Sequence, residues 1–255
     1  MKKFGFPLTP GLNFSSAYSF NNLKELKDYY NFKYSKVRYS RDANSLSLEL
    51  EDVCRFNYDN NHCLSFGSGM SAVSAAIFSK IENDTIIITF GNFYRKSRAI
   101  IEELSSKFKI KNKNFLNYKN FLNWAKKNKR KYKKIIFFLE IPSNPFLKII
   151  DIKNIRETFK NSFIITDLSF TGFKNDKNIL YLSDIVIFSL TKYINGHNDS
   201  LGGILIIKDN KVFEKVWNFR STFGGIIDPM SAYLILRSLK TFDMRSEKMI
   251  SNTNK

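Results

Sequence analysis

The sequence predicts an α/β fold in which a mostly parallel β-sheet is covered by helices on both faces. Short apolar runs rich in isoleucine and phenylalanine, such as 85–90 and 134–140, have the length and β-branched content of buried strands. Helical patterns separate these runs, and strands that alternate with helices are typical of parallel sheets. Polar residues follow several of the strands directly, and ligand sites in such sheets form at the carboxyl ends of strands. The pattern therefore predicts the place of a site together with the fold.

The first part of the chain, residues 7–38, shows little hydrophobic periodicity. We expect an extended arm with one short helix near 22–29, followed after Tyr39 by a helical pattern that runs through Val53. The glycine-containing turn 65–70 leads into a run of small and apolar residues that is typical of a buried helix. Free amides at the start of such a helix favour an anion, although a Gly-x-Gly turn is also common as a purely structural turn.

The remaining elements alternate along the chain. A further helix is expected to begin at Pro229, because proline is favoured in the first turn of a helix. The other helices are expected at 94–108, 118–127 and 152–159, and the strands at 85–90, 134–140, 163–167, 184–189 and 203–208.

The composition is that of a folded protein, with 43% hydrophobic residues and a net charge of +18. The basic run 126–134 keeps a nucleic-acid surface open as an alternative. Because the other lysines are scattered, we expect a solvated basic face and no nucleic-acid partner. No apolar run approaches the roughly 20 residues that span a bilayer, so no membrane partner is expected. Cys54 and Cys63 are too few for a disulfide framework, and without an apolar leader we expect buried thiols in a cytoplasmic protein.

The segment SLTKYINGHNDSLGG, residues 189–203, places Lys192 just after an apolar strand. Burial disfavours the ammonium form of a lysine, so we expect a partly desolvated amine that can act as a nucleophile. Ser189 and Thr191 add hydroxyl groups, and three glycines permit close approach of the backbone to a ligand. The residues suggest an imine-forming lysine beside an anion site, but a Thr-Lys pair in a glycine-containing loop is ordinarily a plain solvated loop.

Other chemistries have little support in the sequence. His62 and His197 are the only histidines, which disfavours a His-rich metal site or a Ser-His-Asp triad. We therefore expect no metal and interpret His197 as a hydrogen-bonding group of the lysine loop. The turn 65–70 is neither a Walker loop nor a dinucleotide fingerprint.

The lysine segment resembles that of the pyridoxal-phosphate enzymes of cysteine and methionine metabolism, which include cystathionine synthases and lyases, methionine γ-lyase and homoserine sulfhydrylases. Further segments resemble the family in the same order, among them the turn 65–70, the EIPSNP segment 140–145 and the run 234–240. The resemblance covers roughly residues 7–250. It implies an aspartate-aminotransferase-like large domain of a fold-type I PLP-dependent transferase, with pyridoxal 5'-phosphate bound as an imine on Lys192.

The resemblance also implies roles for individual residues. Lys192 and Tyr94 would be catalytic, since the lysine removes the substrate α-proton and the tyrosine stacks on the ring and exchanges protons. Asp167 would pair with the pyridine nitrogen, and Asn144 would bond the phenolic oxygen. The phosphate would be bound by backbone and hydroxyl groups of this chain, and by two residues of a neighbouring subunit: Gly69, Met70, Ser189 and Thr191, and from the neighbour Tyr39 and Arg41. Judged alone, a strand-end aspartate is often a cap and an arginine such as Arg41 a surface ion pair.

Three domain ranges follow from the resemblance. Residues 1–45 would form an arm that contacts a neighbouring subunit, residues 46–240 the cofactor-binding large domain, and residues 241–255 the start of a linker helix to an absent C-terminal domain. The family usually has Asn-Pro-Thr at 44–46 and Asn-Thr at 168–169, where this chain has Asn-Ser-Leu and Leu-Ser. We therefore expect the turn at 44–46 and the surroundings of Asp167 to differ.

The implied activity is transsulfuration by a homodimer or homotetramer. The reaction would be β/γ-elimination or γ-replacement on a small-molecule amino acid of the cystathionine, cysteine or homoserine-ester type. In the family, the further domain carries an arginine that fixes the substrate carboxylate. The alternative is therefore a truncated, catalytically impaired homologue that binds the cofactor or a partner subunit without turnover.

Overall fold

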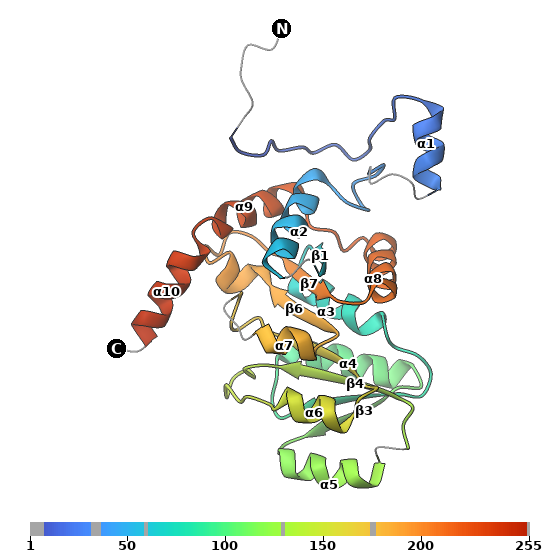
Figure 1. The fold of residues 1–255 in the computed structure, drawn as a ribbon, viewed down its shortest axis with the longest axis vertical. Coiled ribbons are helices and arrows are strands. Elements are labelled where there is room, and N and C mark those ends of the chain that lie inside the picture. Colours follow the sequence, from blue (N-terminus) through green and yellow to red (C-terminus); the bar gives the residue numbers. More distant parts are fainter. Residues whose placement is uncertain (1–7, 32–36, 59–60, 129–130, 174–176, 254–255) are drawn as a thin grey trace.

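The computed structural model describes residues 8–31, 37–58, 61–128, 131–173 and 177–253. These residues form a seven-stranded sheet of order β1-β7-β6-β5-β4-β2-β3 (Figure 1). The strands β2 to β6 pair in parallel, whereas β7 runs antiparallel to both β6 and β1. The strands are β1 (His62–Phe66), β2 (Thr85–Phe90), β3 (Lys111–Phe115), β4 (Lys134–Glu140), β5 (Phe163–Asp167), β6 (Ile185–Ser189) and β7 (Gly203–Ile207). The predicted α/β class with a mostly parallel sheet is confirmed.

Helices cover both faces of the sheet because successive side chains of a buried strand point to opposite faces. Ile86 and Ile88 pack into one hydrophobic cluster, while Ile87 between them packs into the other. One cluster contains buried residues of α3 (Gly69–Phe78), α4 (Arg95–Lys107) and α8 (Asn210–Phe223). The other contains buried residues of α2 (Ser45–Asn57), α5 (Tyr118–Asn128), α6 (Ile152–Thr158), α7 (Lys177–Leu182) and α9 (Pro229–Leu239), and of the start of α10 (Phe242–Thr253).

Two strands were not predicted, and both are edge strands. The first four side chains of β3, a polar KNKN run, are exposed, so β3 is a strand because its backbone pairs with β2. β1 is short and contains polar residues, yet it is mostly buried between its partner β7 and helices α2 and α8. Hydrophobic periodicity finds strands that bury apolar side chains, and it misses both an exposed edge strand such as β3 and a short strand of mixed polarity such as β1. Helices α7 and α8 were also not predicted.

The N-terminal arm lies apart from the sheet (Figure 1). Its helix α1 (Leu23–Tyr30) has no buried residue, and residues 17 and 39 form an isolated antiparallel bridge. Closer to α2 the chain is held firmly, because the buried Arg220 donates to Asp42 O at 2.9 Å and pairs with Glu51. Residues 1–7 of the expected arm lie outside the described residues, and the three domain ranges stay a prediction.

The turn at 44–46, where a difference from the family is expected, begins α2 with Asn44 as its N-cap. The Asn44 side chain accepts from Ser47 N at 2.8 Å, and the Ser47 hydroxyl accepts from Asn44 N at 2.9 Å, which completes a capping box for α2. Among the described residues, no helix combines the length and apolar character that a bilayer crossing requires.

Candidate active site

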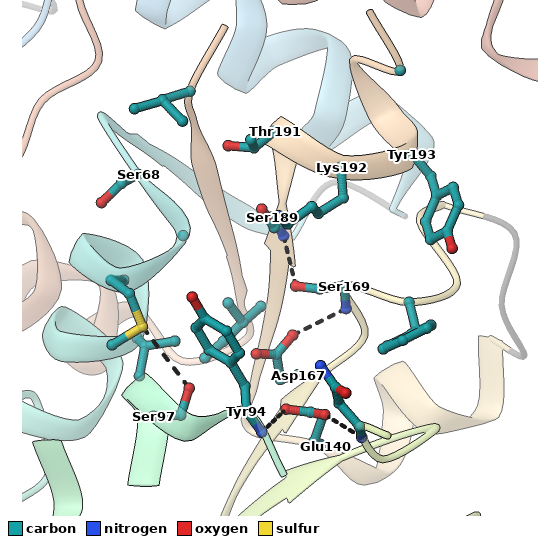
Figure 2. Close-up of a pocket in the computed structure, with 18 of the residues that line it drawn as sticks. Ser68, Tyr94, Ser97, Glu140, Asp167, Ser169, Ser189, Thr191, Lys192 and Tyr193 are labelled. Carbon is teal, nitrogen blue, oxygen red and sulfur yellow. Dashed lines mark hydrogen bonds between the residues drawn. The ribbon is translucent and has the colours of Figure 1, made fainter. Parts of the chain in front are cut away.

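A cavity of about 910 Å³ opens where β4, β5 and β6 end and helices α3 and α4 begin. Figure 2 shows side chains from all of these elements around it. Eight of the ten predicted site residues line this cavity: Gly69, Met70, Tyr94, Asn144, Asp167, Ser189, Thr191 and Lys192. They come from segments up to about 120 residues apart in sequence, and the parallel strands bring them to one edge of the sheet.

One end of the cavity is suited to an anion. Ser68 caps α3 by accepting from Ser71 N at 3.1 Å, and no acceptor is recorded for the amides of Gly69 and Met70 within the described chain. The Ser189 hydroxyl faces the same turn, since a Cβ built on Gly69 would lie 3.3 Å from Ser189 Oγ. Amides at a helix start and a nearby hydroxyl are the donors that a phosphate requires, so these residues fit the phosphate of the cofactor.

The packing of this turn depends on a glycine. A Cβ at Gly203 would lie 2.6 Å from Ser68 O and 2.8 Å from Gly69 Cα, distances that no real Cβ contact reaches. The start of α3 therefore rests directly on the backbone of β7.

A buried carboxylate lies in the middle of the cavity. Asp167 is 6% exposed, and its Oδ1 accepts from Ser169 N at 3.0 Å. Burial raises the pKa of Asp167, and the hydrogen bonds from Ser169 offset this only in part. In the part of the chain that the structure describes, Asp167 forms no ion pair with a basic residue. Asp167 is therefore placed to pair with a cation, and a protonated pyridine nitrogen fits this position.

Ser169, one of the two positions where a difference from the family is expected, contacts Asp167 and β6. The Ser169 amide binds Asp167, and its hydroxyl accepts from Ser189 N at 2.9 Å. Ser169 therefore links the ends of β5 and β6, as the dashed lines in Figure 2 show. The backbone amide of Ser169 makes the first of these contacts, and its hydroxyl makes the second.

Lys192 lies in a π-helical turn, η1 (Leu190–Ile194), that is irregular at the lysine itself, with φ −85° and ψ −123°. Such turns are frequent at functional sites. The predicted desolvation of Lys192 is wrong for this chain, because the residue projects into the open cavity and is exposed. Within the turn the apolar Leu190 and Ile194 are buried, whereas Lys192 between them is exposed.

Two residues fix this turn, Arg245 from outside it and Thr191 from within it. The Arg245 guanidinium of α10 donates to Tyr193 O at 3.0 Å and to Ile194 O at 2.8 Å. The Thr191 hydroxyl accepts from Gly202 N at 2.9 Å and donates to Gly202 O at 3.3 Å, so in this structure the predicted phosphate ligand Thr191 is bound to the chain itself. The sequence analysis missed Arg245, since nothing in a helix of mixed polarity indicates which loop it will reach.

Tyr94 and Asn144, the two residues predicted to bind the cofactor ring, both donate to Glu140. Tyr94, 45% exposed, precedes α4, and Asn144 lies in the loop after β4. Glu140 accepts from Tyr94 N at 2.8 Å through Oε2 and from Asn144 N at 2.6 Å through Oε1. The sequence analysis quoted Glu140 only as part of a motif and assigned it no role.

The remaining predicted residues lie elsewhere. Tyr39 and Arg41 are exposed and are not among the residues of this cavity, and the Arg41 guanidinium lies 5.2 Å from the Tyr39 ring centroid. A single chain does not bring them to its own site. His197 bonds Asn195 O and Ser238 through Nδ1, which confirms it as a hydrogen-bonding group of the loop.

The family model for the Cys/Met metabolism PLP-dependent enzymes matches residues 7–255. The chain belongs to this family. A curated relative, chloroplastic cystathionine gamma-synthase 1 of Nicotiana tabacum, is 30% identical over 251 residues, which are 95% of this chain and 45% of the relative.

Two solved structures share the fold. Cystathionine gamma synthase from Xanthomonas oryzae pv. oryzae, solved with aminoacrylate and cysteine, matches with a TM-score of 0.81 at 24% identity, over 93% of this chain and 59% of the other. A putative O-acetylhomoserine (thiol)-lyase of Campylobacter jejuni, which carries N'-pyridoxyl-lysine-5'-monophosphate, matches with a TM-score of 0.82 at 20% identity, over 93% of this chain and 67% of the other. The cofactor of this Cys/Met family is pyridoxal phosphate, and the chain spans about half the length of the curated relatives.

Proposed function

We propose that this member of the Cys/Met family uses pyridoxal 5'-phosphate for transsulfuration chemistry, by β/γ-elimination or γ-replacement on cystathionine, cysteine or homoserine-ester type amino acids. The observation that carries the proposal is that Lys192, Asp167, Tyr94 and the start of α3 all line one cavity. When bound, the cofactor supplies an aldehyde for amino groups and a ring that withdraws electrons from the substrate α-carbon.

The residues of this chain divide the work. Lys192 Nζ would hold the aldehyde of the cofactor and would serve as the base that takes the substrate α-proton. Asp167 would keep a proton on the pyridine nitrogen. Because the carboxylate is buried and shielded from water, its attraction to the positive charge on that nitrogen is stronger. Tyr94 stacks on the ring, and its hydroxyl can pass a proton to or from the substrate.

The phosphate end is bound by the amides of Gly69 and Met70 and by the hydroxyls of Ser189 and Thr191. For Thr191 this requires that its hydroxyl give up its contact with Gly202 O. Tyr39 and Arg41 are proposed to reach the phosphate of a neighbouring subunit in a homodimer or homotetramer. An arginine suits this task because its planar guanidinium gives two donors to one phosphate.

The test is borohydride reduction of the cofactor-loaded protein followed by peptide mass mapping, with a panel of sulfur amino acids assayed in parallel. We expect the pyridoxyl mass on the peptide that contains Lys192, and release of pyruvate or another α-keto acid. Lys192→Ala removes both, while Lys208→Ala, at the opposite end of the sheet, keeps both. Labelling of another lysine would contradict the proposal. Labelling of Lys192 without product would support a cofactor-binding protein that does not turn over.

A further inference from the structure

Glu140 has an unusual set of contacts for a buried carboxylate. It is the last residue of β4, lies opposite Asp167 in the β4–β5 register and is 6% exposed at the wall of the cavity. Its two oxygens accept from two backbone amides, Tyr94 N at 2.8 Å and Asn144 N at 2.6 Å (Figure 2).

These amides belong to two segments that follow neighbouring strands of the sheet. Tyr94 follows β2 and begins α4, whereas Asn144 lies beyond β4. A carboxylate can accept both amides at once because each of its two oxygens is an acceptor, whereas a side-chain amide of the same length has an acceptor oxygen at one of these positions and an NH2 donor at the other. The residue type is therefore matched to a two-sided bridge.

The bridge is maintained against an electrostatic cost. In the described chain no lysine, arginine or histidine forms an ion pair with Glu140. The pKa of Glu140 is raised to about 7: burial is the largest cause, the neighbouring Asp167 adds to the rise, and the hydrogen bonds from the two amides oppose both. A position that served only to fill space could hold an apolar side chain at less cost.

We propose that Glu140 is a positioning residue of the active site: through the amides of Tyr94 and Asn144 it sets the spacing of the side chain that stacks on the ring and the side chain that bonds the phenolic oxygen. This inference rests on the proposed function for its consequence and on the two hydrogen bonds for its geometry. Glu140 would act through these two residues.

The test compares Glu140→Gln and Glu140→Asp with the wild type. Glutamine keeps the length and loses one acceptor, whereas aspartate keeps the charge and is too short to reach both amides. We expect each variant to bind pyridoxal phosphate about tenfold more weakly, since one charge-assisted hydrogen bond is lost. The circular dichroism of the cofactor band should also fall, because the ring is held less rigidly.

The matched control is Asp184→Asn. Asp184 also accepts from a backbone amide, Ile164 N at 2.7 Å, and pairs with Arg156 at 2.7 Å, but at the other end of the sheet. It should lower the melting temperature and leave the cofactor band and affinity unchanged. If Glu140→Gln behaves like this control, or if Glu140→Asp matches the wild type, positioning by Glu140 is refuted.

A second measurement separates this inference from the proposed function. Hydrogen exchange in the cofactor-free protein should be faster at the amides of Tyr94 and Asn144 in Glu140→Gln than in the wild type. Failure of the wild type to bind the cofactor would overturn the proposed function alone, and unchanged exchange at both amides would overturn the bridge alone.

Discussion

Replacing Gly203 with alanine should damage the phosphate end of the site more than it damages the fold. Gly203 begins β7 and is paired with Phe66 on one side and Ser189 on the other. Its new Cβ would lie 2.6 Å from Ser68 O and 2.8 Å from Gly69 Cα, where ordinary contact begins at 3.4 Å. All of these neighbours are backbone atoms that cannot rotate away.

The overlap requires the start of α3 to move by about 1 Å, and overpacking of this kind costs about 1–3 kcal/mol of unfolding free energy. A displacement of 1 Å takes an amide donor from about 2.9 Å to beyond hydrogen-bonding distance of a phosphate oxygen. Loss of one or two such charge-assisted bonds predicts a Kd for pyridoxal phosphate that is about ten to a hundred times higher.

The assay is a titration of cofactor-free protein with pyridoxal phosphate, with thermal unfolding measured at each concentration. Gly11→Ala is the matched control, because nothing lies within 4 Å of the Cβ it would add. Wild-type affinity in Gly203→Ala would refute the argument that the start of α3 rests on β7 and binds the phosphate.

Two further predictions concern stability. Glu51→Gln should lower the free energy of unfolding by about 3–5 kcal/mol, because it leaves Arg220, 1% exposed, without its charge partner. Urea unfolding measures this loss. The control is Glu103→Gln, which breaks an exposed ion pair and should cost less than about 1 kcal/mol. Equal losses in the two variants would argue against a buried pair. The pKa of Glu140, raised to about 7, means that the folded chain binds more protons than the unfolded chain between about pH 4.5 and 7. Stability of the cofactor-free chain should therefore fall as pH rises through this window, and Glu140→Gln should flatten the fall; an unchanged profile in the variant would exclude Glu140 as its source.

Most of the sheet could be predicted from the sequence because its central strands are buried on both faces. Strands β2, β4 and β5 lie within the predicted ranges, since a strand that is buried on both faces consists mostly of apolar residues. The edge strand β3 escaped prediction because its exposed KNKN side chains carry no hydrophobic signal. Helix α8 begins with Asp209 as a cap and buries Val212 and Val216 at helical spacing, a pattern that was present in the sequence and went unused.

The candidate site divides in the same way. Residue types at strand ends and the lysine segment indicated Lys192, Asp167 and the glycine turn, and the structure brings all three to one cavity. The predicted desolvation of Lys192 failed, because the exposure of a side chain depends on what surrounds the turn and not on the strand before it.

The sequence by itself determined the order of apolar strands, the helix starts and the chemical groups available at the strand ends, because these follow from neighbours along the chain. Only the tertiary structure decided which distant groups meet: the amides of Tyr94 and Asn144 on one carboxylate, Arg245 on the lysine turn, and the start of α3 on Gly203. Such contacts depend on the relative placement of elements that are far apart in sequence, and no local pattern encodes a distance between them.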